Sequence, residues 1–241
     1  GDSKFEGGRM GEVSSKELPE CLEKLGIKMG RFKTGTPPRV NKNSVDFSGM
    51  IEHPGDKETL KFSLRTEEEE VRDRKQLSCY LTHTNKKVHE EILRNLDKSP
   101  SMNEEINSAA PRYCPSLETK ITRFKDKDRH QVFLEPEGYD TNEIYLSGLS
   151  CSLPPNIQEK FLKDIPGLEK SEVMRYSYGV EYDYILPEEI KYSLESKNIE
   201  GLFFAGQING TTGYEEAAAS GIIAGINSSL KVKGKEPLIL G

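Results

Sequence analysis

A glycine-rich loop at residues 206–213, followed directly by a helix of small residues, carries the strongest chemical signal in this sequence. The residues able to contact a ligand are Gln207, Asn209, Gly210, Thr211 and Thr212. The start of a helix presents free N–H groups and a partial positive charge, so it can hold a phosphate or stabilise negative charge on a reduced flavin ring. The polar side chains would then hydrogen-bond the carbonyl and nitrogen edge of the flavin. A tightly packed junction without a ligand explains the same residues equally well.

Two features predict how this segment folds. Residues 202–205, Leu-Phe-Phe-Ala, predict a buried strand leading into the loop. Thr212 and Glu215 have capping-box spacing, in which each side chain bonds a free N–H group near the helix start. We therefore expect a strand, a loop and a helix in immediate succession, with the helix start fixed by Thr212.

Cys114 is the second candidate for chemistry, a lone cysteine between Tyr113 and Pro115. Because proline favours the first helical position, Pro115 would place Cys114 at the N-cap of a helix. The helix dipole and Arg112 would both favour the thiolate, which is the nucleophilic form. Taken alone, the residues leave open an inert buried cysteine instead.

The stretch after Cys114 is locally basic. Between residues 112 and 130, six Lys or Arg stand against three Asp or Glu, a local charge of +3 in a chain of net charge −6. The six cations are Arg112, which precedes Cys114, and Lys120, Arg123, Lys125, Lys127 and Arg129, which follow it. They predict either a patch that contacts nucleic-acid phosphates or an ordinary solvated helix face and turn.

Cys79, His83 and His89 have a spacing that invites comparison with a metal site. A zinc site needs four ligands, or three and a water, in a recognised spacing. No convincing fourth ligand follows, and Cys79 falls in a strand-like run. We therefore expect no metal.

The elements that must position these residues suggest a mixed α/β protein. We expect helices at residues 16–25, at 86–96 with Asn85 as cap, from 114–115 onward, at 156–163 and after the glycine-rich loop. We expect strands at 60–64, 78–82, 131–134, 144–149, 173–176, 180–184 and 202–205. Pro37 and Pro38 predict a loop over 33–39 that breaks any regular element. The acidic run 67–70 predicts a solvated loop or helix face.

Composition sets limits on the class of protein. The 241 residues are 34% hydrophobic and 31% charged, and no apolar run approaches the roughly 18 residues of a membrane span. The net charge of −6 argues against a protein that simply coats nucleic acid. Four dispersed cysteines without a CxxC indicate free thiols in a reducing compartment. The first residues have no signal- or transit-peptide pattern.

Several long motifs resemble one family in the correct order. The C-terminal motif, Gly-Leu-Phe-Phe-Ala-Gly-Gln-Ile-Asn-Gly-Thr-Thr-Gly-Tyr-Glu-Glu-Ala-Ala-Ala, is similar almost letter for letter to the FAD motif of the wobble-uridine tRNA modification enzymes, the GidA or MnmG family. Further matching segments are residues 6–9, 31–39, 79–85, 111–116, 134–138, 141–145 and 150–154. This order of motifs is far more specific than a lone GxGxxG.

The resemblance implies roles for particular residues. It assigns FAD contacts to Ser15, which could otherwise be a helix cap, and to the glycine-rich loop. It implies that Cys114 is the catalytic nucleophile, activating C5 of uridine by adding to C6 of the base. It also implies a NAD(H) region at Ala110, Pro111, Arg112, Tyr113, Pro115 and Ser116. In this chain, Ser108-Ala109-Ala110 stands where family members usually have glycines.

The resemblance also implies an architecture and partners. Family members begin with a strand–GxGxxG–helix unit and end with a helical region, and neither occurs here, so we expect an internal fragment that is inactive alone. The expected fold is α/β: residues 1–36 and 131–241 would belong to a Rossmann-like, glutathione-reductase-type FAD domain, and residues 37–130 to a smaller inserted α/β domain. The implied partners are the tRNA anticodon arm, a GTPase subunit and a second copy in a homodimer.

The activity implied for the intact enzyme is installation of a carboxymethylaminomethyl-type group at C5 of the wobble uridine, position 34 of tRNA. It would use FAD, NADH and methylene-tetrahydrofolate as the carbon donor, in the cytoplasm, or in mitochondria for a eukaryotic source. One alternative is the related folate- and FAD-dependent tRNA uridine methyltransferase. Another, of a different class, is a non-catalytic module that binds tRNA or protein.

Overall fold

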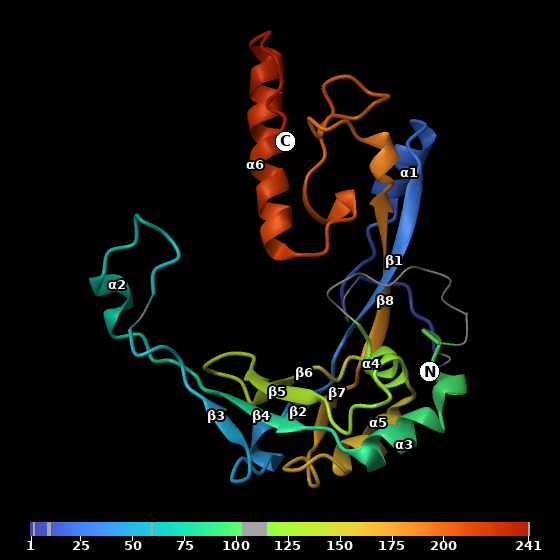
Figure 1. Cartoon of the computed structure of the whole chain (residues 1–241), viewed down its shortest axis with the longest axis vertical. Helices are drawn as coiled ribbons and strands as arrows, with labels where there is room; N and C mark the ends of the chain where they lie inside the picture. Colours follow the sequence, from blue (N-terminus) through green and yellow to red (C-terminus); the bar gives the residue numbers. More distant parts are fainter. Residues whose placement is uncertain (2, 9–10, 59, 103–114, 241) are drawn as a thin grey trace. The chain divides into compact units, whose positions relative to one another are not determined.

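A computed structural model describes residues 1, 3–8, 11–58, 60–102 and 115–240, which divide into two compact units (Figure 1). Of the described residues, unit 1 contains 1, 35–102 without 59, and 116–179. Unit 2 contains 3–34 without 9 and 10, 115, and 180–240. Strands and helices occur in both units, so the α/β prediction is confirmed.

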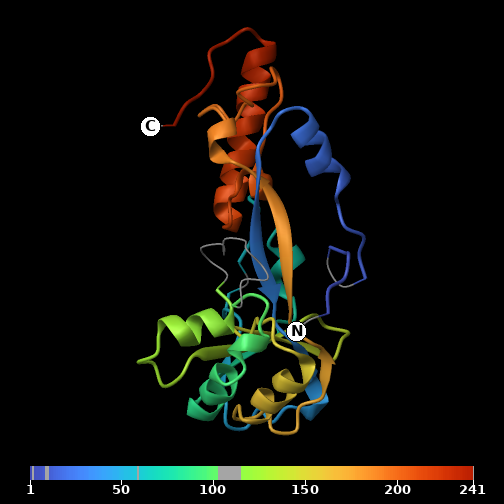
Figure 2. The same ribbon diagram turned by 90° about the vertical axis from the view of Figure 1, so that its right-hand side faces the viewer.

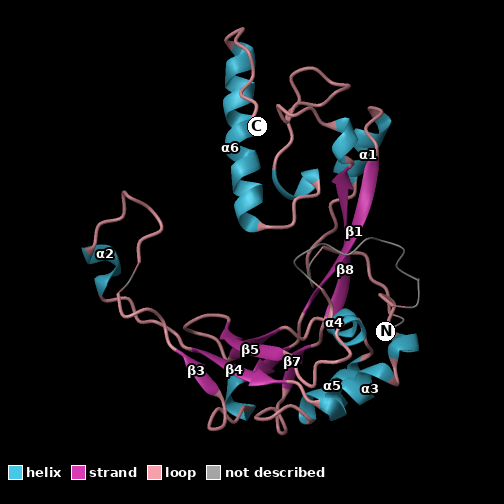
Figure 3. Ribbon diagram, viewed as in Figure 1, coloured by secondary structure: helices cyan, strands magenta, loops and turns pink. Residues whose placement is uncertain are grey.

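Unit 1 is built on a six-stranded sheet in which every described neighbour pair is antiparallel (Figure 3). The strands, in the order β3-β4-β5-β6-β2-β7, are β3 (Ile51–His53), β4 (Cys79–His83), β5 (Gln131–Pro136), β6 (Glu143–Ser147), β2 (Arg39–Asn41) and β7 (Val173–Arg175). Strand β5 pairs Leu134 with both Tyr80 of β4 and Leu146 of β6. These pairings fix which face of the sheet is buried.

Three helices cover that buried face: α3 (Lys86–Leu93), α4 (Leu117–Arg123) and α5 (Pro155–Lys163). The strands alternate, so Val132, Leu134 and Leu146 point inward while their neighbours do not. Ile92 of α3 and Phe161 of α5 complete a core whose side chains are almost wholly inaccessible to water. At about 25 cal/mol per Å² of apolar surface, such burial is the main source of stability in unit 1.

The helix predictions in unit 1 hold with small changes. Asn85 caps α3 by accepting a hydrogen bond from the Val88 N–H at 3.2 Å, but the helix ends at Leu93 rather than near residue 96. Helix α5 begins at Pro155, where the missing N–H costs no intrahelical bond. A short 3-10 turn, η2 (Leu96–Lys98), follows α3.

Strands β1 (Met29–Thr36) and β8 (Tyr178–Ile185) form a separate two-stranded ribbon, visible in Figure 2. The division between the units falls within both strands, at residues 34/35 and 179/180. The predicted loop over 33–39 is therefore wrong. The two prolines interrupt only residues 37 and 38, and Arg39 closes the turn by donating to the Thr36 hydroxyl at 2.6 Å.

Residues 42–75 add only short elements to unit 1. These are η1 (Lys42–Ser44), β3 and α2 (Glu69–Arg72). The predicted strand at 60–64 is wrong, because Leu60, Phe62 and Leu64 are exposed and have no sheet to join. The acidic run 67–70 is solvent-exposed and enters α2, as predicted.

Unit 2 contains α1 (Glu17–Lys24), η3 (Pro187–Glu189), η4 (Gly206–Asn209) and the long helix α6 (Tyr214–Val232). Its buried apolar cluster consists of Leu22, Ile27, Ile185 and Phe204, with partly buried neighbours. The predicted strand at 202–205 is wrong. Phe203 makes only an isolated bridge with Glu195, because no neighbouring strand among the described residues extends the pairing.

The predicted assignment of segments to a flavin domain and an inserted domain stays a prediction. Unit 1 extends to Gly179, past the expected boundary at residue 130, because β5 pairs with β4 and β6 pairs with β2. Among the described residues, no helix is both long and apolar enough to cross a membrane.

Candidate functional site

The glycine-rich loop of unit 2 folds as a 3-10 turn followed by a left-handed residue. Gly206–Asn209 form η4, and Gly210 has φ of 76°. Helix α6 then begins at Tyr214 with Gly213 as N-cap, without a side-chain cap. The expected capping box is therefore wrong, because the helix starts too late for Thr212 to cap it. The helix has 19 residues, so its exposed start carries a full macrodipole.

Three hydrogen bonds hold the first half of the loop. The Gly206 N–H donates to the Ser220 hydroxyl at 2.8 Å, which ties the loop to the second turn of α6. The Asn209 side-chain amide donates to the Phe204 carbonyl at 2.9 Å, and the Gly210 N–H donates to Gln207 O at 3.0 Å. The conformation of the loop is thereby fixed by groups of the chain itself.

An aromatic pair of the ribbon supports the second half. The rings of Phe32 and Tyr184 are stacked, with centroids 4.0 Å apart and planes inclined by 13°. A Cβ added at Gly210 would lie 3.0 Å from Cδ2 of Tyr184, closer than real side chains normally approach. Gly210 is thus required twice, for its backbone conformation and for its close approach to the ring.

The polar groups of this loop fit the edge of a flavin. The Asn209 Oδ1 atom is buried and accepts no hydrogen bond from the described residues. An unpaired buried acceptor is uncommon in native structures, and a donor from a ligand would satisfy it. Gln207 is exposed, Thr211 and Thr212 are half-buried, and the adjoining start of α6 adds free N–H donors. This structure therefore brings together all five predicted loop residues.

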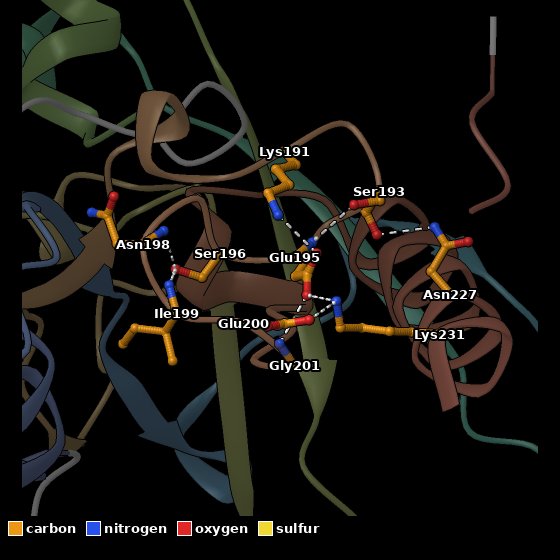
Figure 4. A network of polar contacts seen from close by, with 10 residues as sticks. All are labelled: Lys191, Ser193, Glu195, Ser196, Asn198, Ile199, Glu200, Gly201, Asn227 and Lys231. Atoms are coloured by element: carbon orange, nitrogen blue, oxygen red, sulfur yellow. Dashed lines mark hydrogen bonds and ion pairs between the residues drawn. The ribbon is translucent and has the colours of Figure 1, made fainter. Parts of the chain in front are cut away.

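A polar network, shown in Figure 4, holds α6 against the preceding loop. The buried carboxylate of Glu195 accepts from the Gly201 N–H at 2.8 Å, from Lys191 at 2.9 Å and from Lys231 of α6 at 2.9 Å. These bonds, the backbone one first, lower the pKa of Glu195 to about 2. Glu195 remains ionised and anchors the C-terminal half of the helix.

Asn227 makes a second anchor on α6 (Figure 4). Its buried amide donates to the Ser193 and Leu238 carbonyls, both at 2.9 Å, and accepts from the Leu238 N–H at 2.7 Å. One side chain therefore satisfies three groups of two loops. No sequence pattern indicated either anchor, because α6 is held by contacts of Lys231 with Glu195 and of Asn227 with Ser193, which are distant in sequence.

The predicted nucleophile and most of the predicted NAD(H) residues lie outside the described residues: Ala110, Pro111, Arg112, Tyr113 and Cys114. The start of α4 differs from the prediction. Ser116, not Cys114, caps α4, by accepting from the Thr119 N–H at 3.2 Å. Pro115 is therefore not the first helical residue, and activation of Cys114 by an N-cap position no longer follows.

The described cysteines, Cys21, Cys79 and Cys151, are free. Burial raises the pKa of the Cys151 thiol far above its usual value, with the Glu118 carboxylate as a smaller cause. Burial also raises the pKa of Cys79. Neither of these two is prepared to act as a thiolate nucleophile.

A buried carboxylate in the first turn of α4 was not predicted from the sequence. Glu118 has no exposed surface, and its Oε1 accepts from the Ser99 hydroxyl and the Ser152 N–H, both at 2.9 Å. Its Oε2 accepts nothing from the described residues. Glu118 therefore ties the start of α4 to residues 99 and 152, which lie far away in the sequence.

His89 belongs to a cluster of its own in unit 1. Its Nε2 lies 2.8 Å from the Thr84 hydroxyl, and its ring lies 5.2 Å from that of His130. Burial is the main reason that the pKa of each histidine is lowered. The part of the chain that the structure describes holds no group of three or more side chains suited to a metal ion.

The remaining predicted residues are accessible to different degrees. Arg123, Lys125, Lys127 and Arg129 are exposed, at the end of α4 and in the turn before β5. Lys120 is half-buried and donates to the Gly148 carbonyl at 3.4 Å. Ser15 is exposed in the segment before α1, whose N-cap is Lys16, so Ser15 does not cap that helix.

Comparison with known proteins gives matches over the whole chain. The model of the family described as glucose inhibited division protein A matches residues 1–236. Two similar proteins, from Syntrophomonas wolfei and Thermodesulfovibrio yellowstonii, are both called tRNA uridine 5-carboxymethylaminomethyl modification enzyme MnmG. They are 54% identical over 240 residues and 53% identical over 237 residues. The matches cover 100% and 98% of this chain but only 38% of each relative.

Solved structures agree with these matches. Two crystal forms of GidA from Aquifex aeolicus superpose on this chain with TM-scores of 0.84 and 0.86, at 47% and 48% identity. Each superposition covers the whole of this chain, and 38% or 41% of the crystallised chain.

Proposed function

The chain belongs to the glucose inhibited division protein A family, and from that premise we propose that it forms the flavin-edge part of an enzyme that modifies C5 of the wobble uridine in tRNA. The observation that carries the proposal is the loop at residues 206–213, which is ordered yet leaves a buried acceptor on Asn209 unpaired. The chain spans 38% of the length of the relatives named above, so the activity is proposed for the whole protein.

Each residue of the loop has a role in this proposal. Asn209 accepts from the flavin edge, while Gln207, Thr211 and Thr212 add hydrogen bonds beside the exposed start of α6. The N–H groups of that helix stabilise negative charge at the same edge. Ser15 contributes a hydroxyl from the segment before α1. A bound flavin would supply reversible electron transfer.

Cys114 is the proposed nucleophile. Its thiolate forms a bond to C6 of uracil, and the electron pair displaced from the C5–C6 bond makes C5 a carbon nucleophile. That carbon attacks a one-carbon unit from methylene-tetrahydrofolate. Loss of the C5 proton expels the folate nitrogen and leaves a methylene group double-bonded to C5. An amine that carries a carboxymethyl group adds to this methylene and loses a proton, and the thiolate then departs from C6, which restores the base and frees the cysteine. NAD(H), held by residues 110–113, 115 and 116, is the proposed source of electrons.

A gene deletion tests the assignment. We expect tRNA from the deletion strain to lack the C5 modification at position 34, as measured by mass spectrometry of its nucleosides. A copy carrying Cys114→Ser should fail to restore it, whereas the exposed-cysteine control Cys21→Ser should restore it fully. Full modification with Cys114→Ser would exclude the nucleophile. Loss of a methylated uridine elsewhere would instead identify the related methyltransferase.

The exposed cations after α4 are the proposed contact with the tRNA anticodon arm. Lys125, Lys127 and Arg129 are exposed. Removing one cation that binds a phosphate should reduce the slope of log affinity against log salt by about one. The triple glutamine variant should therefore bind tRNA more weakly and with less salt dependence than the wild type, in filter-binding titrations of the full-length protein. An unchanged slope would identify the patch as an ordinary solvated face.

The remaining partners follow from the same premise. The proposal includes a GTPase subunit, a homodimer and action in the cytoplasm. Co-purification of tagged full-length protein with a GTPase, and light scattering of the product, test the first two. Firm tRNA binding without flavin absorbance or modification would favour a non-catalytic binding module.

A further inference from the structure

The ring of Tyr184 lies against two glycine backbones of unit 2. On one side, a Cβ added at Gly30 of β1 would lie 2.6 Å from the Cζ of Tyr184. On another edge, a Cβ added at Gly210 would lie 3.0 Å from Cδ2 and 3.4 Å from Cε2 of the same ring. An aromatic residue that covers a glycine of the neighbouring strand is a known device for fixing strand pairing. Here the same ring also contacts a loop.

Phe32 keeps the Tyr184 ring in place. The two rings are stacked at 4.0 Å, and Tyr182 adds a tilted contact to Phe32 at 5.7 Å. Aromatic pairs at such distances are stabilised beyond the area that they bury. Phe32 stacks on the Tyr184 ring and Gly30 lies close to its Cζ atom, so the ring has little freedom to move away from Gly210.

The loop depends on this contact more in its second half than in its first. Gly206 and Asn209 are fixed by hydrogen bonds to Ser220 and to Phe204. Thr211 and Thr212 make no hydrogen bond to described residues, although they lead directly into the start of α6. The Gly210 N–H donates to Gln207 O, and between that bond and the helix the support comes from the Tyr184 ring in contact with Gly210.

We propose that Tyr184, supported by Phe32 and Gly30, is a positioning residue that holds the loop at residues 206–213 in its binding conformation through Gly210. This inference rests on the proposed role of that loop at the flavin edge. It adds a requirement that the loop sequence alone does not contain: an aromatic ring on a strand that precedes the loop by more than twenty residues.

The first test compares two glycines that share a backbone conformation. Gly210 and Gly201 have φ of 76° and 80°, but a Cβ at Gly201 would meet nothing within 4 Å. In the full-length protein, Gly210→Ala should weaken FAD binding by about tenfold or more, which corresponds to the interaction energies measured between residues in contact. Gly201→Ala carries the same backbone strain without the contact and should change affinity by less than about twofold. Affinity is measured by flavin fluorescence titration, and thermal unfolding is measured alongside.

The second test asks whether the ring itself is responsible. Tyr184→Leu shortens the side chain facing Gly210, so it should loosen the loop in the wild-type background but make room for a methyl group in Gly210→Ala. The double variant should therefore bind FAD more tightly than the product of the two single effects predicts, by about threefold or more. Tyr184→Phe should behave as wild type. Strict multiplicativity would overturn the role of the ring.

Hydrogen exchange separates this inference from the proposed function, because it needs no flavin. Tyr184→Ala should increase exchange at amides 206–213 by at least about tenfold, while the exposed-tyrosine control Tyr192→Ala should not. If Tyr184→Ala changes neither loop exchange nor flavin affinity, the inference is wrong. If it frees the loop while FAD affinity stays at the wild-type value, the inference stands, and the loop does not hold the flavin.

Discussion

Units 1 and 2 achieve order by different means. Unit 1 closes a continuous apolar core between an antiparallel sheet and three helices, with residues such as Phe161 and Leu134 fully buried. Unit 2 buries only four large apolar residues among those described, and it relies on Glu195 and Asn227 to hold its longest helix. The candidate flavin loop lies in the unit with the smaller apolar core.

This difference has a physical consequence. A core held by burial is indifferent to charge and tolerates few changes of volume. A helix held by hydrogen-bonded ions is sensitive to single charges, since a buried ion that loses its partner is costly. We therefore expect unit 1 to be more sensitive to changes of side-chain volume, and the attachment of α6 in unit 2 to be more sensitive to changes of charge.

The largest effect is expected in the core of unit 1. Phe161→Ala should destabilise unit 1 by about 4 kcal/mol, because it removes a fully buried ring and leaves a cavity. Hydrogen exchange followed by mass spectrometry should show faster exchange in β5 and β6. The matched control is Phe124→Ala, at a position where the ring is 52% exposed. Equal acceleration in α6 would mean that the two units unfold as one.

A smaller effect is expected from the charge of Glu195 in unit 2. Glu195→Gln should destabilise the attachment of α6 by about 2 kcal/mol, because it leaves Lys191 and Lys231 without a buried anion. Glu200→Gln is the matched control, since Glu200 contacts the same Lys231 at 3.0 Å but is 86% exposed. It should cost less than about 0.5 kcal/mol. Identical exchange of α6 in both variants would refute the anchoring role.

The smallest effect should distinguish the units by pH. The pKa values of His89 and His130 are lowered, chiefly by burial, so below about pH 6.5 the unfolded chain binds protons that the folded unit 1 does not. Unit 1 should lose stability as the pH falls from 7 to 5. The contribution of Glu195 to unit 2 is also lost on acidification, but at lower pH. Because its pKa is lowered to about 2, this contribution is complete above about pH 4.5 and disappears toward pH 2.

Hydrogen exchange measured at pH 7 and at pH 5 checks which unit loses stability first. We expect unit 1 to lose protection first, and His89→Gln to reduce that loss. Asp128 favours the charged form of His89, while Lys120 and Lys127 oppose that of His130. Loss of protection in α6 before β5 would contradict the assignment.

The sequence predicted what depends on local pattern. The strand expected at 131–134 formed β5, Asn85 capped α3 as expected, and the small residues after the loop formed α6. The five candidate loop residues were likewise predicted from one contiguous motif, and their role at a flavin stays a prediction. Such features depend on neighbours within a few residues, which a single sequence displays.

The predictions that were wrong concern features that depend on partners far away in the chain. Residues 202–205 have the composition of a strand, but no described neighbouring strand extends their single bridge. The prolines after Thr36 suggested a wide loop, whereas pairing with β8 keeps residues 33–36 extended. Helices α4 and α6 begin later in the sequence than predicted, because Ser116 and Gly213 are their N-cap residues. The roles of Glu118 and Tyr184 were missed for the same reason, since their partners are remote in sequence, and so was the contact of Glu195 with Lys231.

Asn227 gives the path of the chain after α6 an unusual dependence on one functional group. A primary amide offers a donor and an acceptor in one plane. The Asn227 side chain therefore donates to the Leu238 carbonyl and accepts from the Leu238 N–H, the same two bonds that a paired strand residue would make. A carboxylate in its place, as in Asn227→Asp, would remove the donor and place a negative charge against two carbonyl oxygens. The attachment of Leu238 therefore depends on one side-chain amide, whereas the described strands of unit 1 are joined by repeated backbone pairing.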